Sequence, residues 1–240
     1  MLTGLLQLAY NTADSVVVGR YAGSTTSIIF LQVTLFNGVS IGTNYLTARY
    51  YGAGDQEAIS QTVHCSAVLS VILGLMAGVV GILFSTPLLE LAGAPMDVLP
   101  LSSLYLKIYF LGIPALVAYN FGSAILRAKG DTQRPLYFLL AAGVLNVVLN
   151  LFFVIVCRLD VTGVAMATSI SQYVSAWLIL RCLMREHGAL HLNLHRMHLN
   201  KRVIGRIFQV GLPAGFQGVI FSLSNVVIQS AINSFGSTVV

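Results

Sequence analysis

Residues 136–157 read LYFLLAAGVLNVVLNLFFVIVC, an apolar stretch without a charged side chain. A helix needs about 20 residues of this kind to cross the hydrocarbon core of a bilayer. The stretch does not alternate between apolar and polar residues as a strand would. A lipid-exposed segment must also satisfy its own backbone hydrogen bonds, which a helix does. The stretch therefore predicts a membrane-spanning helix.

Six further runs of this kind occupy the rest of the chain. They cover residues 1–21, 27–50, 58–84, 99–126, 161–183 and 203–235. Of the 240 residues, 56% are hydrophobic and 9% are charged, whereas a soluble domain usually carries about 25% charged residues. Such a chain cannot cover a water-facing surface with polar groups. This excludes a soluble enzyme, a nucleic-acid binder and a disordered protein, and predicts an all-α, polytopic membrane helix bundle.

Basic residues gather in the loops after the second, fourth and sixth runs. If these loops share one side of the membrane, that side holds 10 of the 13 Lys and Arg residues, and the other side keeps Arg20, Lys107 and Arg158. Lys and Arg concentrate on the cytoplasmic side of membrane proteins. We therefore expect a multi-pass protein of the cell (inner) membrane with a cytoplasmic N-terminus and an external C-terminus.

Four of the five histidines lie in the hydrophilic stretch 185–206. His191 and His195 are four residues apart, which suggests a metal site as one interpretation and a polar linker on the inner leaflet as the other. Glu186 is the one nearby carboxylate, and the three cysteines are widely spaced, so we expect a linker and no metal site. His64 is expected to be a packed or interfacial residue rather than a proton relay.

Polar residues inside the apolar runs are the candidates for function. Asp14 lies in the first run, and a carboxylate within the hydrocarbon is costly and a functional candidate by default. The alternative is that it caps the helix or pairs with Arg20. Asn146 and Asn150 are four apart and share a helical face. Their amide oxygens can serve a cation, or the two residues can form interhelical hydrogen bonds.

Small residues and a proline predict how two of the helices pack. Gly74, Gly78 and Gly81 recur along one predicted helix, and we expect them to form a close-packing surface. Pro114 lies inside the fourth run, where it removes a backbone hydrogen bond and can kink the helix.

Four motifs carry a family resemblance. They are YNTADS at 10–15 with VGR at 18–20, the segment from GT at 42–43 to YGAGD at 51–55, LRAKGDT at 126–132, and LNVVLN at 145–150. In this order and spacing they resemble the signatures of the MATE (multidrug and toxic compound extrusion) transporters of bacteria, over nearly the whole chain.

The resemblance implies twelve helices in two six-helix lobes, with substrate carried in a cavity between them. It implies export of drugs or small organic, often cationic, compounds by antiport with Na⁺ or H⁺, with no enzymatic activity and no cofactor besides the coupling ion. Residues 1–184 then form the N-terminal lobe, 185–202 a cytoplasmic linker, and 203–240 the first helix of an incomplete second lobe. The missing lobe is expected in the same chain or an adjacent one.

The resemblance also implies that polar residues on the fourth to sixth helices line a cavity. Matching positions complete the expected cation- or substrate-binding set, which is Asp14, Tyr105, Asn120, Ser123, Asn146, Asn150 and Thr168. The family often has a carboxylate where Asn150 stands. This departure puts a two-carboxylate proton mechanism in doubt and leaves Asp14 as the main charge.

Three alternatives remain open. A lipid-linked saccharide flippase of related architecture needs several cationic residues in its cavity, whereas Lys107 alone lies within a helix well away from the inner loops. A membrane enzyme needs a nucleophile with a base, or a metal cluster, at one depth, and the apolar runs offer neither. A non-transporting fragment is compatible with every motif.

Overall fold

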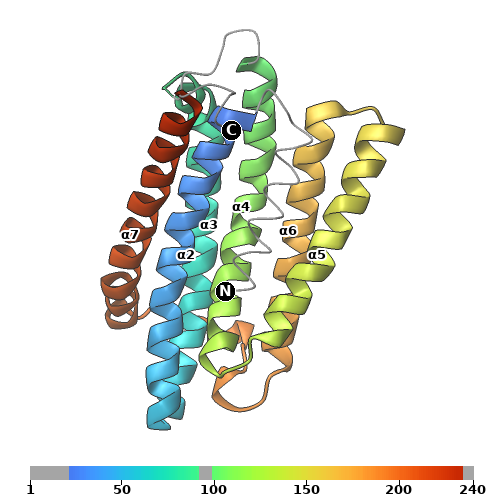
Figure 1. Ribbon diagram of the computed structural model, residues 1–240. Coiled ribbons are helices and arrows are strands. Elements are labelled where there is room, and N and C mark those ends of the chain that lie inside the picture. The colour runs from blue at the N-terminus through green and yellow to red at the C-terminus, as the bar shows by residue number, and fades with distance from the viewer. Residues whose placement is uncertain (1–21, 92–98, 235–240) are drawn as a thin grey trace.

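The structure, a computed structural model, describes residues 22–91 and 99–234 (Figure 1). Within these residues six long helices run up and down and no strand occurs. They are α2 (Ala22–Ala53), α3 (Gln56–Leu91), α4 (Leu99–Ala128), α5 (Gln133–Leu151), α6 (Asp160–Arg185) and α7 (Lys201–Ser234). The predicted helices from the second to the seventh are confirmed. The first predicted helix, and Asp14 with it, lies outside the described residues.

Two helices differ in detail from the prediction. α3 continues through Pro87 to Leu91 rather than ending near residue 84. The run 136–157 is not one uniform α-helix, because α5 ends at Leu151 and passes into a π-helical turn, η2 (Phe152–Val156). Chain hydropathy sets the length of an apolar segment but carries no information on how its last turns are wound.

A Gly-Asp dipeptide lies between two successive helices at two places in the chain. Gly54 and Gly130 have φ of 70° and 93°, a left-handed conformation that costs glycine little. The amide of the following aspartate then bonds back to the carbonyl of Tyr50 or Leu126, which closes the C-terminus of the helix. The carboxylates in turn accept the amides of Ala58 and Arg134 and so cap α3 and α5.

α4 lies at the centre of the bundle, between α3 and α6 (Figure 1). α3 approaches it through glycines: a β-carbon on Gly74 would lie 2.7 Å from Pro114 Cα, and one on Gly81 would overlap the Phe110 ring. The predicted close-packing surface on this helix is therefore confirmed. On the other side Ser169 Oγ of α6 donates to the carbonyl of Ile108 at 2.8 Å.

α7 packs mainly on α2, at one edge of the bundle (Figure 1). The two backbones cross at glycines, since a β-carbon on Gly38 would lie 2.1 Å from Gly215 Cα and one on Gly42 2.1 Å from the Ile207 carbonyl oxygen. α5 lies at the opposite edge, on α6. Small residues thus bring backbones together where lipid offers no hydrophobic driving force between helices.

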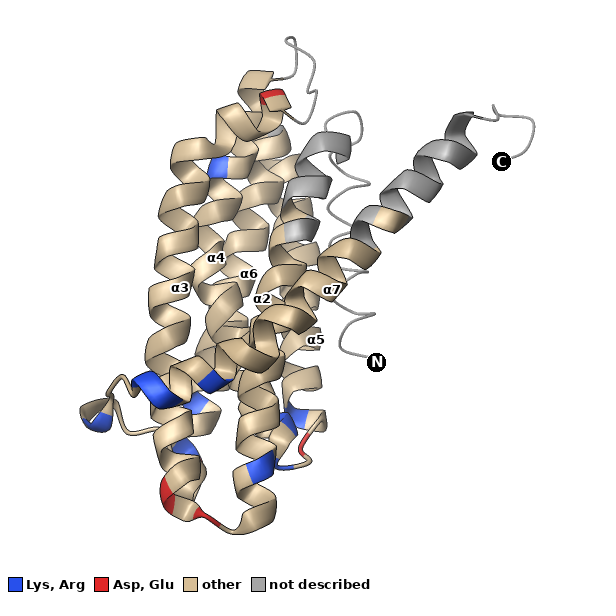
Figure 2. Cartoon of the chain, turned by 90° about the vertical axis from the view of Figure 1, so that its left-hand side faces the viewer, with Lys and Arg blue, Asp and Glu red and all other residues tan. Residues whose placement is uncertain are grey.

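The outer faces and ends of the bundle suit a bilayer. Five described helical segments are long and apolar enough to span a membrane: Gln56–Leu91, Leu99–Ala128, Gln133–Val156, Val161–Arg185 and Lys201–Phe221. Large apolar side chains such as Leu83, Val144 and Ile220 are exposed on them. Most Lys and Arg residues gather at the end where α2 passes into α3 (Figure 2). The predicted multi-pass membrane bundle is therefore confirmed.

The glycine crossing of α2 and α7 predicts an asymmetry between two substitutions. Gly38→Ala places a methyl group inside the backbone of Gly215, and we expect a loss of about 1–3 kcal/mol from overpacking. Gly205→Ala is the matched control on α7, because a β-carbon there meets nothing within 4 Å. It is expected to be neutral or to stabilise by up to about 1 kcal/mol. Thermal unfolding in detergent measures both, and equal stability of the two variants would contradict the crossing.

Candidate functional site

The buried face of α5 carries the two predicted asparagines. Its buried residues are Pro135, Leu139, Ala142, Asn146 and Asn150, which recur every three or four positions and form one inward stripe. The sequence prediction that both asparagines share a face is confirmed. Both are almost fully buried, with 1% and 6% of their surface exposed. The stripe holds two amides within an otherwise apolar surface.

A chain of hydrogen bonds joins this stripe to α6. Asn150 Nδ2 donates to Asn146 Oδ1 at 3.1 Å, and Asn146 Nδ2 donates to Thr168 Oγ1 at 3.3 Å. Thr168 Oγ1 in turn donates to the carbonyl of Val164 at 2.9 Å. The interhelical hydrogen bond that the sequence left as an alternative is therefore present. The same three side chains place amide and hydroxyl oxygens at one depth between two helices.

The three predicted residues of α4 are also buried. Tyr105, Asn120 and Ser123 are at most 5% exposed, and the Tyr105 ring stacks with that of Tyr109 at 6.5 Å between centroids. Asn120 Nδ2 has no hydrogen-bond partner among the described residues. Within the described part of the chain, the structure brings together Asn146, Asn150 and Thr168 through hydrogen bonds and buries the three predicted residues of α4.

Gln172 is a buried polar residue that the sequence analysis did not single out. It lies one helical turn after Thr168, is 5% exposed, and its Oε1 has no hydrogen-bond partner among the described residues. A β-carbon on Gly112 of α4 would meet this oxygen at 2.2 Å. The spacing of four from Thr168 was the available signal, since it puts both side chains on one side of α6.

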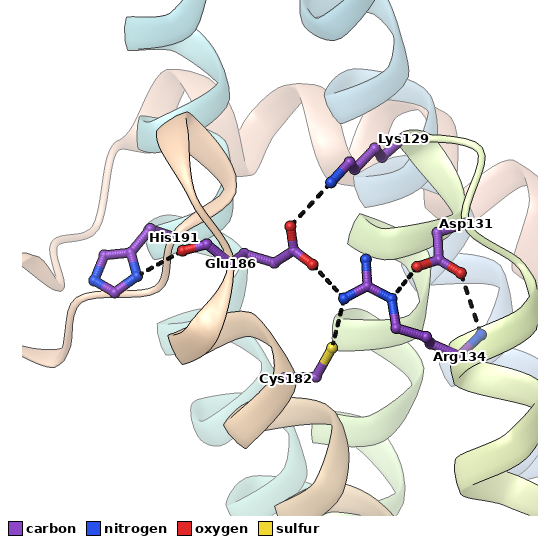
Figure 3. Close-up of polar contacts among 6 residues, drawn as sticks. All are labelled: Lys129, Asp131, Arg134, Cys182, Glu186 and His191. Atoms are coloured by element: carbon purple, nitrogen blue, oxygen red, sulfur yellow. Dashed lines mark hydrogen bonds and ion pairs between the residues drawn. The ribbon is translucent and has the colours of Figure 1, made fainter.

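The basic end of the bundle holds an ion-pair network (Figure 3). Lys129 Nζ donates to Glu186 Oε2 at 3.0 Å, and Arg134 donates to the other oxygen of the same carboxylate. Arg134 also pairs with Asp131 through Nε, and its Nη1 contacts Cys182 Sγ at 3.3 Å. The network ties the α4–α5 loop to the end of α6. Glu186 entered the sequence analysis only as a possible metal ligand.

Both carboxylates of the network are held in the charged form. Burial raises the pKa of Glu186, but the hydrogen bonds and charges of Lys129 and Arg134 outweigh it, so the pKa lies below its usual value. Burial acts the same way on Asp131, and bonds from the Arg134 amide and guanidinium again bring the pKa below its usual value. The four charges sum to zero.

The linker after α6 is anchored by His64. Its Nδ1 bonds to the carbonyl of Ser60 at 2.7 Å, and its Nε2 accepts the amide of Asn193 at 3.0 Å. The proton therefore lies on Nδ1, because the carbonyl can only accept and the amide can only donate. His64 is 2% exposed, which confirms the prediction of a packed residue. His191 donates to the carbonyl of Glu186 at 3.1 Å. Within residues 22–91 and 99–234, no group of three or more His, Cys, Asp or Glu residues is placed to hold a metal ion.

Comparison with known proteins assigns the family. The MatE family model matches residues 1–152, which is more than half of the chain. The chain belongs to the MATE family. The predicted resemblance is confirmed, and the membrane bundle described above is the MATE fold.

The MATE relatives are longer than this chain. It is 31% identical over 248 residues to the probable multidrug resistance protein YpnP of Bacillus subtilis (strain 168), covering 100% of this chain and 55% of the relative. It is 24% identical over 245 residues to the multidrug export protein MepA of Staphylococcus aureus (strain NCTC 8325 / PS 47). That match covers 99% of this chain and 54% of the relative. The chain thus spans about half the length of the curated relatives it matches.

A solved structure supports the same fold. It is the outward-facing conformation of a multidrug resistance MATE family transporter of the MOP superfamily, which matches this chain with a TM-score of 0.86 and 26% identity. The match covers 98% of this chain and 54% of that one. The described helices therefore correspond to about half of a MATE transporter.

The ion-pair network of this MATE chain predicts a stability that depends on pH. Because the pKa of Glu186 is lower in the folded state than its ordinary value of 4.5, the pairs stabilise the fold fully above about pH 4.5. The stabilisation is lost as the pH falls through the folded-state pKa. We expect Glu186→Gln to lower the free energy of unfolding by about 1–3 kcal/mol at neutral pH, since it leaves Lys129 without a carboxylate and Arg134 with Asp131 alone.

Denaturation followed by circular dichroism between neutral pH and pH 3 measures this effect. Glu57→Gln is the matched control, since Glu57 is exposed, accepts a bond from Gln61 and forms no ion pair within the described residues. Glu186→Gln should flatten the acid limb of the stability profile, and Glu57→Gln should leave it unchanged. Identical profiles for native chain and Glu186→Gln would show that the network contributes no stability.

Proposed function

We propose that this chain is one lobe, with the first helix of a second, of a secondary active transporter that exports drugs or small organic, often cationic, compounds. The observation that carries the proposal is the family match over residues 1–152. The relatives' names as multidrug resistance and export proteins support the substrate class. Inward flow of Na⁺ or H⁺ across the cell membrane drives the export.

The coupling-ion site combines one charge with neutral oxygens. Asp14 supplies the carboxylate, and Asn146 and Asn150 supply amide oxygens, with Asn120 and Thr168 as further contacts. Hard cations prefer such oxygen ligands. In a proton-coupled cycle Asp14 itself takes up the proton. The burial of the amides and the bond from Asn146 to Thr168 support this assignment, since they fix the oxygens within the bundle.

The flippase alternative has less support. A cavity that binds the pyrophosphate of a lipid-linked saccharide needs cationic side chains facing inward. Lys107 is exposed, and no Lys or Arg side chain among the described residues is buried. The described polar interior is neutral instead, with asparagine, glutamine, serine and threonine side chains. Such an interior suits an organic cation better than a pyrophosphate.

Transport requires a second lobe, because alternating access rocks two halves around a central site. We expect no dye efflux from vesicles that contain this chain alone as a monomer. Joining the chain to the complementary half of the Bacillus subtilis relative should restore efflux driven by a Na⁺ or H⁺ gradient. Gradient-driven efflux by the monomer would contradict the two-lobe proposal. A well-folded joined protein without gradient-driven efflux would contradict the export function.

The ion site predicts opposite effects for two substitutions in the joined protein. Asp14→Asn removes the charge and should abolish coupling, a loss of at least about tenfold in efflux, while insertion stays normal. Asn150→Asp adds a carboxylate beside Asn146 and should strengthen cation binding or shift its pH dependence. Asp55→Asn is the control, since Asp55 is exposed and caps α3. Efflux at several Na⁺ concentrations and pH values measures all three, and native coupling in Asp14→Asn would refute the site.

The charge distribution predicts the orientation of the chain. A cysteine placed at Gln133, next to the basic α4–α5 loop, should react with an impermeant maleimide only after cells are permeabilised. The natural Cys157 is the matched reporter, because it is exposed at the other end of the α5 segment, and it should react on intact cells. The other two cysteines are replaced by serine. The reverse pattern of labelling would invert the proposed topology, with its cytoplasmic N-terminus.

A further inference from the structure

A cavity of about 580 Å³ opens between α5 and α6 at the basic end of the bundle. Its lining includes Arg134 and Phe138 from α5, and Trp177, Arg181, Cys182 and Arg185 from α6. Residues 134 and 138 are one turn apart, as are 177, 181 and 185, so each helix contributes a continuous face. Ligand cavities commonly measure about 300–1,000 Å³. None of the described residues of the proposed transport site lines this cavity.

The cavity carries positive charge that the protein does not neutralise. Lys129 and Arg134 are balanced by Asp131 and Glu186 in the ion-pair network. Arg181 and Arg185 form no ion pair among the described residues. Arg181 lies instead over the ring of Trp177, 4.9 Å from its centroid, a cation–π contact that holds the guanidinium at the cavity wall. Two cationic charges therefore remain for an anionic ligand.

The lipid-facing side of α6 identifies the source of that anion. Ile170, Tyr173 and Trp177 are exposed and recur every three or four residues, and Arg181 and Arg185 continue the same face toward the basic end. The face thus passes from apolar residues through a tryptophan to arginines. This order matches the acyl chain, interfacial region and phosphate of a phospholipid, since tryptophan favours the membrane–water interface and basic cavities between helices bind anionic headgroups.

We propose that this cavity binds the phosphate headgroup of an anionic phospholipid from the adjoining leaflet, with Arg181 and Arg185 as its ligands. Arg134 lines the cavity but stays in its ion pairs with Asp131 and Glu186. The acyl chains lie along Tyr173 and Ile170. The site does not depend on the proposed export function, because its ligand belongs to the bilayer rather than to the transport pathway.

The chain contains a single tryptophan, Trp177, which makes the cavity observable. The purified chain is placed in vesicles of phosphatidylcholine that contain a minor fraction of brominated phosphatidylglycerol or, in parallel, brominated phosphatidylcholine. Bromine quenches the fluorescence of a tryptophan that it touches. We expect the anionic lipid to be favoured at Trp177 by at least tenfold, because each basic residue contributes about fivefold to the binding of an anionic lipid.

Two double variants distinguish a specific binding site from a general effect of surface charge. The double variant Arg181→Gln with Arg185→Gln should show nearly equal quenching by the anionic lipid and by phosphatidylcholine. Arg49→Gln with Arg202→Gln removes the same charge from exposed positions at the same end of the bundle that do not line the cavity, and should keep the native preference. The single variant Arg185→Gln leaves the contact of Arg181 with Trp177 intact. Its preference for the anionic lipid should be about fivefold lower than that of the native chain. Quenching by brominated phosphatidylcholine reports in each case that Trp177 still faces lipid.

The remaining outcomes overturn the proposal in distinct ways. Equal quenching by the two brominated lipids in the native chain would show that the cavity does not select anions. A preference that survives Arg181→Gln with Arg185→Gln, or that falls equally in both double variants, would show that general surface charge causes it. Inorganic phosphate is also added to the vesicles that contain brominated phosphatidylglycerol. If phosphate at a concentration below that of the anionic lipid abolishes the preference, the arginines bind soluble phosphate more strongly than the lipid and the lipid assignment is wrong. Partial relief at higher phosphate concentrations is the competition expected when a headgroup phosphate occupies the same arginines.

Discussion

Close packing of small residues against α4 is the constraint on which the rest of this structure depends. Lipid tails are as apolar as leucine, so helices in a bilayer are held together by van der Waals contact and hydrogen bonds rather than by exclusion of water. Gly74 brings α3 against Pro114, and the Ser169 hydroxyl bonds α6 to the Ile108 carbonyl. With both flanks of α4 occupied, α5 is left on α6, and α7 is left on α2.

The edge position of α5 explains the polar chain on its buried face. A helix with one inward stripe can place polar groups there only if the next helix satisfies them, because an unpaired buried amide is costly. Asn146 meets this condition by donating to Thr168 of α6, and the Asn150 amide nitrogen donates to Asn146 Oδ1 within α5. If a cation takes Asn146 Oδ1 in the proposed ion site, it displaces the Asn150 amide, which is a bond within α5, while the bond from Asn146 Nδ2 to Thr168 can still hold α5 to α6.

The sequence predicts those features of the fold that are local in the chain. Apolar length alone located the helices from 27–50 onward, and a spacing of four placed Asn146 and Asn150 on one face. The contacts that lock the basic end are not local. Arg134 and Glu186 are 52 positions apart, and His64 and Asn193 are 129 apart. The polarity of a loop does not predict such pairings. Several cations are candidates to pair with Glu186, and only the packing of the helices determines which two do.

The cations at the basic end of the bundle have two different roles, which the composition of the chain does not distinguish. Lys129 and Arg134 form ion pairs with Glu186 and Asp131. They therefore hold the α4–α5 loop to α6 and contribute little to the net electrostatic field. Arg181 and Arg185 have no such carboxylate among the described residues. In the proposed lipid site, the attraction for an anionic headgroup therefore comes from these two arginines rather than from the network. The proposed orientation depends on a different property, because it counts every Lys and Arg residue near the membrane boundary whether or not a carboxylate pairs with it.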